Sequence, residues 1–280
     1  RQVAKAFREH LYAPHHPYFY SPRGTLETTP TLTVEDMRAF HATYYGPKEM
    51  LLCVVGAVQA REVIDLVYEY MGDWRNPHQP GEPALPALAP LREIHRTMVS
   101  LPGKSQSDIM LGVIGPSRLA PDYQAASLAN SVLGQFGMMG RIGESVREKS
   151  GMAYYAYSRL EGGLGPGAWL VTMGVNPKHI DAAIELSLQE VKRMLKEPID
   201  PAELRDNQNY YVRRLPLQLE SNEGLCGVIL TMETYNLGLD YLLHYEDSIM
   251  RLTPDELRAA LHRYWDMQAY VLAIAGSQPQ

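Results

Sequence analysis

The stretch LTVEDMRA at residues 32–39 recurs as LTPDELRA at residues 252–259, and this repeat determines how the chain is organised. At the same offset of 220 positions, the apolar run that ends at Gly56 meets the apolar run that ends at Gly276. A recurrence that keeps both order and spacing predicts two homologous domains.

Both copies of the repeat carry the same local signals. Thr33 and Thr253 suit the N-cap position of a helix, and each is followed three residues later by an acid that can complete a capping box. Each predicted helix leads into an apolar run, residues 50–55 and 270–275, which indicates a buried strand. The predicted unit is a helix followed by a strand, used twice.

The offset also gives the expected domain boundaries. Residues 94–280 form a second domain that contains the whole pattern, whereas residues 1–75 form the C-terminal part of a first domain. The counterpart of residues 94–220, 127 residues in all, is missing from that first domain, which we therefore expect to be truncated. The proline-rich stretch 76–93 is the expected linker.

The hydrophobic pattern of residues 94–280 predicts an α+β fold, with strands and helices interleaved along the chain. The expected strands lie near residues 94–101, 108–114, 153–159 and 168–175, and the expected helices near 123–133, 139–149, 180–195 and from 201 onward. Gly151 is expected to end the helix over 139–149, because glycine readily adopts the left-handed conformation of a helix cap.

Composition narrows the classes of partner. The net charge of −6 argues against nucleic acid, whose binding draws on clustered Lys and Arg, and no apolar run approaches the length of a membrane span. Cys53 and Cys226 both lie in apolar surroundings and are expected to be buried free thiols. The chain opens at Arg1 and shows no targeting signal, so the compartment is unknown, with the cytoplasm as a default guess.

The chain resembles the pitrilysin/insulinase superfamily of zinc peptidases, of the mitochondrial processing peptidase type. The matching features are His16-Pro17-Tyr18, the first copy of the repeat from Leu32 to Gly56, and REKSGMAY at residues 147–154. The resemblance implies two similar α+β domains, each with a mixed or antiparallel sheet packed on helices. It also implies that the first domain carries a His-x-x-Glu-His zinc motif and a later Glu, and that the second is metal-free.

The zinc motif is absent from this sequence. No two of its nine histidines stand four residues apart around an intervening Glu, and the stretch 123–133, where the second domain would hold the motif, has neither His nor Glu. No metal or cofactor is therefore expected here, and the resemblance places zinc in the missing part of the first domain. His10, His15 and His16 could form a cluster, although surface or packing roles are the alternative.

The resemblance assigns Arg147 and Tyr154 to substrate binding, because residues with this seven-residue spacing face the zinc and hydrogen-bond the substrate backbone in that family. A guanidinium and a phenol can both donate to a carbonyl or to a developing oxyanion. The alternative is structural: Arg147 would interact with the end of its helix, and Tyr154 would pack in the core.

Other chemistries find little support. Gly103-Lys104-Ser105 lacks the earlier glycine of a phosphate loop, and the chain has no Gly-x-Ser-x-Gly nucleophile elbow. The glycine-rich stretch 161–167 is expected to be a hairpin turn, with an anion-binding nest as the alternative.

Two hypotheses of function follow. In the first, the chain is the C-terminal part of a zinc endopeptidase, inactive alone, that supplies the substrate-binding half of a chamber for peptides or unfolded polypeptides. In the second, it belongs to a non-catalytic subunit or structural homologue that binds polypeptide or a partner chain. Either version could form a homodimer or heterodimer that closes the chamber.

Overall fold

The computed structural model describes residues 1–137 and 139–277, which group into two compact units. The larger, here called the sheet unit, contains residues 1–20, 86–212 and those from 244 onward. The smaller, here called the small unit, contains residues 21–85 and 213–243. In the described part of the chain, no helix is both long and apolar enough to cross a membrane.

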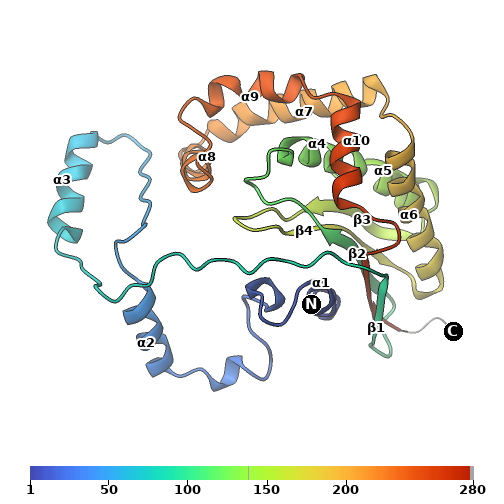
Figure 1. Cartoon of the computed structure of the whole chain (residues 1–280), viewed down its shortest axis with the longest axis horizontal. Coiled ribbons are helices and arrows are strands. Elements are labelled where there is room, and N and C mark those ends of the chain that lie inside the picture. The colour runs from blue at the N-terminus through green and yellow to red at the C-terminus, as the bar shows by residue number, and fades with distance from the viewer. Residues whose placement is uncertain (138, 278–280) are drawn as a thin grey trace. The chain divides into compact units, whose positions relative to one another are not determined.

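A five-stranded mixed sheet organises the sheet unit (Figure 1). Its strands are β1 (His95–Ser100), β2 (Ser107–Ile114), β3 (Ala153–Leu160), β4 (Ala168–Val175) and β5 (Val271–Gly276). They lie in the order β1-β5-β2-β4-β3; β1 pairs with β5 in parallel, and the other pairs are antiparallel. The predicted α+β class and mixed sheet are confirmed.

The sheet is covered on both faces. Alternate residues of β4, including Trp169, Val171 and Met173, are buried against α4 (Tyr123–Gly134), α6 (Ile180–Lys196) and α10 (Pro254–Tyr264). Ala168 and Leu170 face the other way and pack with α1 (Gln2–Leu11). Because successive strand residues point to opposite faces, a nearly continuous apolar strand fits a sheet covered on both sides.

The position of α1 departs from the sequence-based domain boundaries, which assign residues 1–75 to the first domain. In the structure, Val3, Ala6 and Phe7 of α1 are buried with residues of β5, the last strand of the predicted second domain. The helix 220 positions later, α8 (Asn222–Thr234), is grouped with the small unit instead. Each compact unit thus contains one helix that the repeat assigns to the other domain: α1 in the sheet unit and α8 in the small unit. The boundaries of the two homologous domains stay a prediction.

Further helical segments complete the sheet unit: η1 (Pro17–Phe19), α5 (Gly140–Ile142), η3 (Gly143–Lys149), η4 (Pro177–His179), and parts of α7 (Pro201–Leu219) and α9 (Tyr241–Met250), both of which extend into the small unit. Asp200 caps α7, because its Oδ1 accepts hydrogen bonds from the backbone N–H groups of Ala202 and Glu203 at 2.8 and 3.3 Å.

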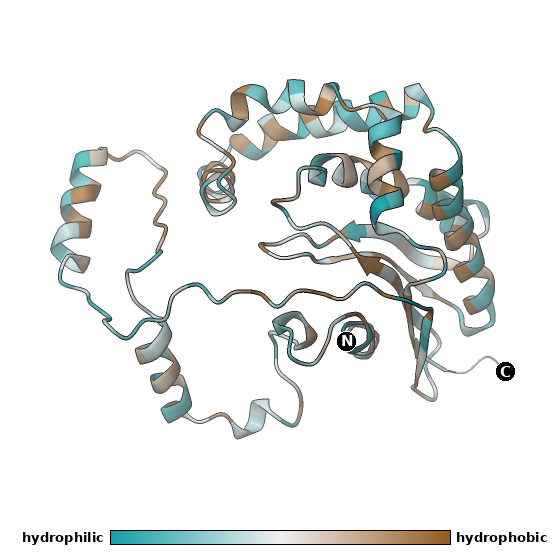
Figure 2. Cartoon of the chain, in the orientation of Figure 1, coloured by the Kyte–Doolittle hydropathy of each residue, from teal (hydrophilic) through white to brown (hydrophobic). Residues whose placement is uncertain are grey.

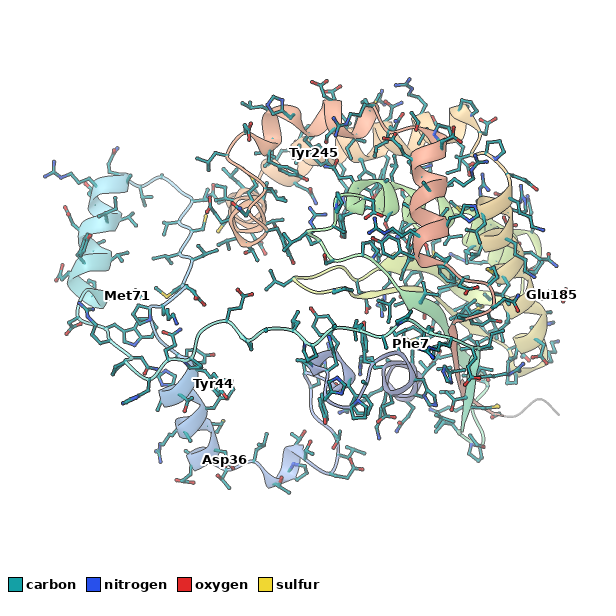
Figure 3. All side chains as sticks on the ribbon, viewed as in Figure 1. Phe7, Asp36, Tyr44, Met71, Glu185 and Tyr245 are labelled. Atoms are coloured by element: carbon teal, nitrogen blue, oxygen red, sulfur yellow. The ribbon has the colours of Figure 1, made fainter. Side chains whose placement is uncertain are left out.

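The small unit contains η2 (Thr29–Thr31), α2 (Val34–Tyr44), α3 (Ala60–Met71) and α8. Neither α2 nor α3 has a buried residue, and the side chains labelled Tyr44 and Met71 stand on helices with few neighbours (Figure 3). Figure 2 shows that the extended stretch before α3 is hydrophobic. Residues 50–55 form no strand, so the predicted strand is not found; a strand needs a partner to satisfy its backbone N–H and C=O groups.

Candidate functional site

Arg147 lies on η3, a seven-residue π-helical turn that leads from α5 to β3. The turn is anchored from both sides: Arg141 of α5 pairs with Glu203 of α7 through an Nε to Oε1 distance of 2.9 Å, and Val146 is fully buried. Short π-helical turns are frequent at functional sites, because the extra residue re-aims the side chains that follow. This geometry was not expected from the sequence, which predicted an ordinary helix.

The Arg147 side chain is only loosely held. Its Nε lies 3.5 Å from Oε1 of the adjacent Glu148, and 36% of the Arg147 side chain is exposed. An exposed ion pair at this distance contributes little to stability. The guanidinium can therefore turn toward another acceptor at small energetic cost.

Gly151 ends the helical segment as predicted. Its φ is +64°, in the left-handed region, and its N–H donates to the carbonyl of Arg147 at 2.9 Å. A residue with a side chain is strained in this backbone conformation, so glycine suits the position where the chain turns from η3 into β3.

Tyr154 lies at an irregularity of the edge strand β3. Ala153 pairs with Val175 and Tyr155 with Gly174, so β3 has one extra residue, Tyr154, opposite two consecutive residues of β4. Such a β-bulge turns a side chain away from the regular pleat. Tyr154 is 65% exposed, and among the residues that the structure describes, its hydroxyl has no hydrogen-bond partner.

The two predicted substrate-binding residues thus lie on adjacent elements, both accessible to solvent. Within the described residues, no hydrogen bond or ion pair joins Arg147 to Tyr154. The structural alternative, in which Tyr154 packs in the core, does not fit its exposure. That the two side chains share one wall and act on substrate stays a prediction.

The next tyrosine along the strand is fixed rather than free. The hydroxyl of Tyr155 donates to Asp108 Oδ1 at 2.9 Å, and Gln106 Nε2 donates to the same oxygen at 2.8 Å. Burial, and then the Asp108 carboxylate, raise the pKa of Tyr155 well above its ordinary value. Tyr155 therefore stays protonated and bonded, while Tyr154, one residue earlier, is left available.

The helix α4 has no capacity for zinc. At the spacing of His-x-x-Glu-His it presents Ser127, Asn130 and Ser131, and Asn207 joins them from α7. The hydroxyl of Ser131 donates to Asn207 Oδ1 at 2.7 Å, and Asn130 Oδ1 accepts from Trp169 Nε1 at 2.9 Å. These groups are neutral and already have hydrogen-bond partners, since Ser127 pairs with the Tyr211 hydroxyl at 3.0 Å. Catalytic zinc takes His, Asp, Glu or Cys ligands instead. The residues present do not fit the metal.

These hydrogen-bonded pairs were not predicted from the sequence. Their signal was available: Asn130 and Ser131 interrupt a helix whose other residues from Ala125 to Leu133 are mostly apolar, and a polar pair on a buried helix needs partners. The identity of those partners depends on α7 and β4, far away in sequence.

Two of the three histidines near the N-terminus have partners of their own, and the third, His15, is exposed. His16 is buried, stacks on Tyr12 with ring centroids 5.5 Å apart, and accepts the backbone N–H of Tyr18 at its Nδ1. His10 contacts the carbonyl of Ala6 through Nδ1 at 2.7 Å. Over residues 1–137 and 139–277, no three His, Cys, Asp or Glu side chains gather in a way that could hold a metal ion.

Comparison with known proteins places the chain in context. Residues 31–211 match the family described as the peptidase M16 inactive domain. An uncharacterized zinc protease of Streptomyces coelicolor is 27% identical over 249 residues, which cover 84% of this chain and 52% of that protein. The chain therefore spans about half the length of this curated relative.

Two further proteins bear on the fold and its uses. The crystal structure of a peptidase M16 inactive domain from Pseudomonas fluorescens superposes with a TM-score of 0.82 and 25% identity, over 100% of this chain and 66% of that one. Human mitochondrial cytochrome b-c1 complex subunit 1 is 27% identical over 124 residues, or 43% of this chain and 25% of that protein.

Proposed function

Because the chain belongs to the peptidase M16 family through that family's inactive domain, we propose that it supplies the metal-free, substrate-holding half of a zinc endopeptidase. Arg147 and Tyr154 are the residues that hold the substrate backbone. The bulge at Tyr154 carries this proposal, since it leaves an unpartnered phenol exposed on the strand that follows the Arg147 turn.

The chemistry of the two side chains suits a polypeptide of any sequence. A guanidinium is always charged and offers several N–H donors, and a phenol offers one O–H donor, so both can bind backbone carbonyls. Groups that donate to a carbonyl before reaction donate more strongly to the oxyanion that forms during peptide hydrolysis. With contacts to the backbone only, the peptidase would accept substrates according to whether they fit its chamber rather than according to their side chains.

The small unit supports a second element of the proposal. We infer that residues 1–75, most of which lie in this unit, are the C-terminal part of the first M16 domain, whose remaining strands and zinc site precede Arg1 in the intact protein. The apolar side chains of residues 50–55 are exposed, whereas those of the matching strand β5 are buried. Strands supplied by the preceding part of the protein would pair with residues 50–55 and cover this surface.

A role as a non-catalytic subunit is the second candidate, and the similarity to a protein named as a subunit of the cytochrome b-c1 complex supports a place in an assembly. In that case, the intact protein would bind a polypeptide or partner chain without cleaving it, alone or as half of a dimer. Sequencing upstream of Arg1 separates the two candidates, since a His-x-x-Glu-His motif there supports the peptidase.

The role of the pair is tested in the intact, zinc-loaded protein. We expect Arg147→Ala or Tyr154→Phe to lower kcat/KM for an unstructured peptide by about 10- to 1000-fold, the effect of losing one transition-state donor. The free energy of unfolding should change by less than about 1 kcal/mol, because Tyr154 is exposed and the Arg147 side chain is partly exposed. Peptide hydrolysis and melting temperature are measured for each variant.

Tyr157→Phe is the matched control, because Tyr157 lies on the same strand and packs beside Tyr155 with ring centroids 5.9 Å apart. Its hydrolysis rate should stay near that of the parent protein. Normal hydrolysis in the Arg147 and Tyr154 variants, together with a large fall in melting temperature, would mean that the pair is structural.

A further inference from the structure

The two cysteines of the chain lie next to each other in the small unit. Cys53 and Cys226 are 173 positions apart in sequence, yet Cys226 Sγ lies 3.7 Å from the backbone oxygen of Cys53. Both residues are half-buried rather than buried, which corrects the expectation from the sequence. A hydrogen bond with the Cys226 thiol raises the pKa of the Cys53 thiol above its ordinary value.

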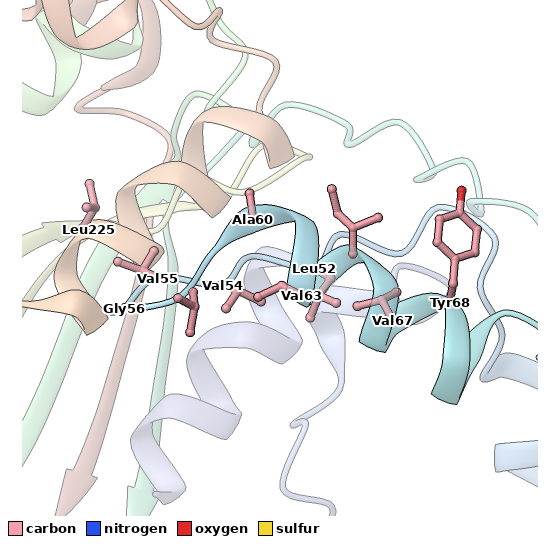
Figure 4. Close-up of a pocket in the computed structure, with 11 residues that line it drawn as sticks. Leu52, Val54, Val55, Gly56, Ala60, Val63, Val67, Tyr68 and Leu225 are labelled. Atoms are coloured by element: carbon pink, nitrogen blue, oxygen red, sulfur yellow. The ribbon is translucent and has the colours of Figure 1, made fainter.

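Chain neighbours of both cysteines line an apolar groove of about 710 Å³. Leu52 and Val54, the chain neighbours of Cys53, line this groove, and so does Leu225, the neighbour of Cys226. In Figure 4, Leu225 on α8 stands beside Val55 and Gly56 of the extended stretch. The thiols are thus held by two segments that pack on each other rather than by one mobile loop.

The other copy of the repeat has a buried helix–strand contact at the positions that match the two cysteines. At the offset of 220 positions, Cys53 corresponds to Ala273 of β5 and Cys226 to Ala6 of α1. Ala6 and Ala273 are buried in one cluster where α1 crosses the sheet. Small side chains at both positions let a helix approach a strand closely, and close backbones are what a disulfide requires.

We propose that Cys53 and Cys226 form a reversible intramolecular disulfide that ties α8 to residues 50–56. This inference rests on the small unit alone and is independent of the proposed role of Arg147 and Tyr154. The bond would close a loop of 173 positions and restrict the unfolded chain, which is the main way in which disulfides stabilise proteins.

The oxidant is a small-molecule disulfide such as oxidised glutathione. One cysteine thiolate attacks it, forming a mixed disulfide and releasing one reduced glutathione. The second cysteine thiolate then attacks the protein sulfur of that mixed disulfide and releases the second glutathione. Two protein thiols lose two electrons in total, one glutathione disulfide gains them, and the two protons pass to the released thiolates.

The test uses the 280-residue chain, reduced and freed of reductant, then incubated with oxidised glutathione under native conditions. We expect both reactive thiols to disappear and the intact mass to fall by about 2 Da, for two hydrogens, without retained glutathione. A digest should yield a reducible peptide that joins Cys53 to Cys226. Cys53→Ser and Cys226→Ser should each retain one glutathione instead, because no second thiol displaces it.

Retention of two glutathione molecules, or of two free thiols, by the parent chain would overturn the proposal. Disulfide-linked dimers that form equally in the parent chain and in both single variants would overturn it too. If a variant fails to fold, as judged by its circular dichroism, the mass and the linked peptide of the parent chain still decide the question.

Discussion

Two helices of this chain, α2 and α10, begin with the same hydrogen bonds and end in different surroundings. Thr33 and Asp36 form a full capping box at the start of α2, and Thr253 and Glu256 form the same box at the start of α10. Leu257 of α10 is fully buried, whereas its counterpart Met37 of α2 is 61% exposed. Local sequence fixes the helix start in both copies, but burial depends on which other segments are present.

The segments that follow the two helices also differ in burial, and only one of them forms a strand. β5 lies between β1 and β2 and is bonded on both edges, so its residues are buried. The matching stretch 51–56 has no strand partner among the described residues and remains extended and mostly exposed. A helix makes its backbone hydrogen bonds within itself, whereas a strand needs neighbouring strands for them. One copy of the repeat can therefore form its helix without forming its strand.

The largest expected effect separates the two helices by their packing. Leu257→Ala should lower the free energy of unfolding by about 2–5 kcal/mol, because it removes methyl groups from a fully buried site. Met37→Ala, at the matching position of α2, should change it by less than about 0.5 kcal/mol, because the side chain is exposed. Urea unfolding followed by tryptophan fluorescence measures both. Equal losses would show that α2 is buried in solution.

A smaller effect tests what the helices share. Thr253→Ala should cost about 0.5–2 kcal/mol, the usual cost of losing an N-cap. Thr33→Ala should shorten α2, seen as lost helicity by circular dichroism, with little change in the unfolding midpoint of the sheet unit. A helicity that neither substitution changes would contradict the idea that the capping boxes start these helices.

The pH dependence of both boxes has a defined sign. The hydrogen bonds from Thr33 and Thr253 lower the pKa of Asp36 and Glu256 below their ordinary values. A carboxyl group whose pKa is lower in the folded state stabilises that state at pH values above the pKa that the group has in the unfolded chain. This contribution is lost as the pH falls through the group's pKa in the folded state. The threonine substitutions should therefore matter at neutral pH and matter less in acid.

Much of the sheet unit could be predicted from the sequence because its signals are local. Apolar periodicity located the strands β1 to β4 and the helices α4 and α6, and Gly151 was correctly expected to cap a helix. Three features depend on distant partners and escaped prediction: the packing of α1 on the sheet, the π-helical form of η3 and the bulge at Tyr154. The bulge arises from the register of β3 against β4, which the sequence of β3 alone does not encode.

The candidate site likewise has features that the sequence shows and features that depend on distant partners. The spacing of Arg147 and Tyr154 was visible in the sequence through the resemblance to the zinc peptidases, and the structure adds that Tyr154 is exposed and Arg147 partly exposed. The hydrogen bonds of Ser131 with Asn207 of α7 and of Asn130 with Trp169 of β4 could be recognised only once those elements were placed.

Backbone hydrogen exchange of the two matching segments tests the central claim most directly. The amides of residues 271–276 should exchange more slowly than those of residues 51–56 in the same 280-residue chain by on the order of 100-fold or more, because only the former lie in a sheet. Mass spectrometry of peptic peptides after timed deuteration gives both rates in one experiment. Equal and strong protection of the two segments would contradict the account, since residues 51–56 would then be paired in a sheet of their own.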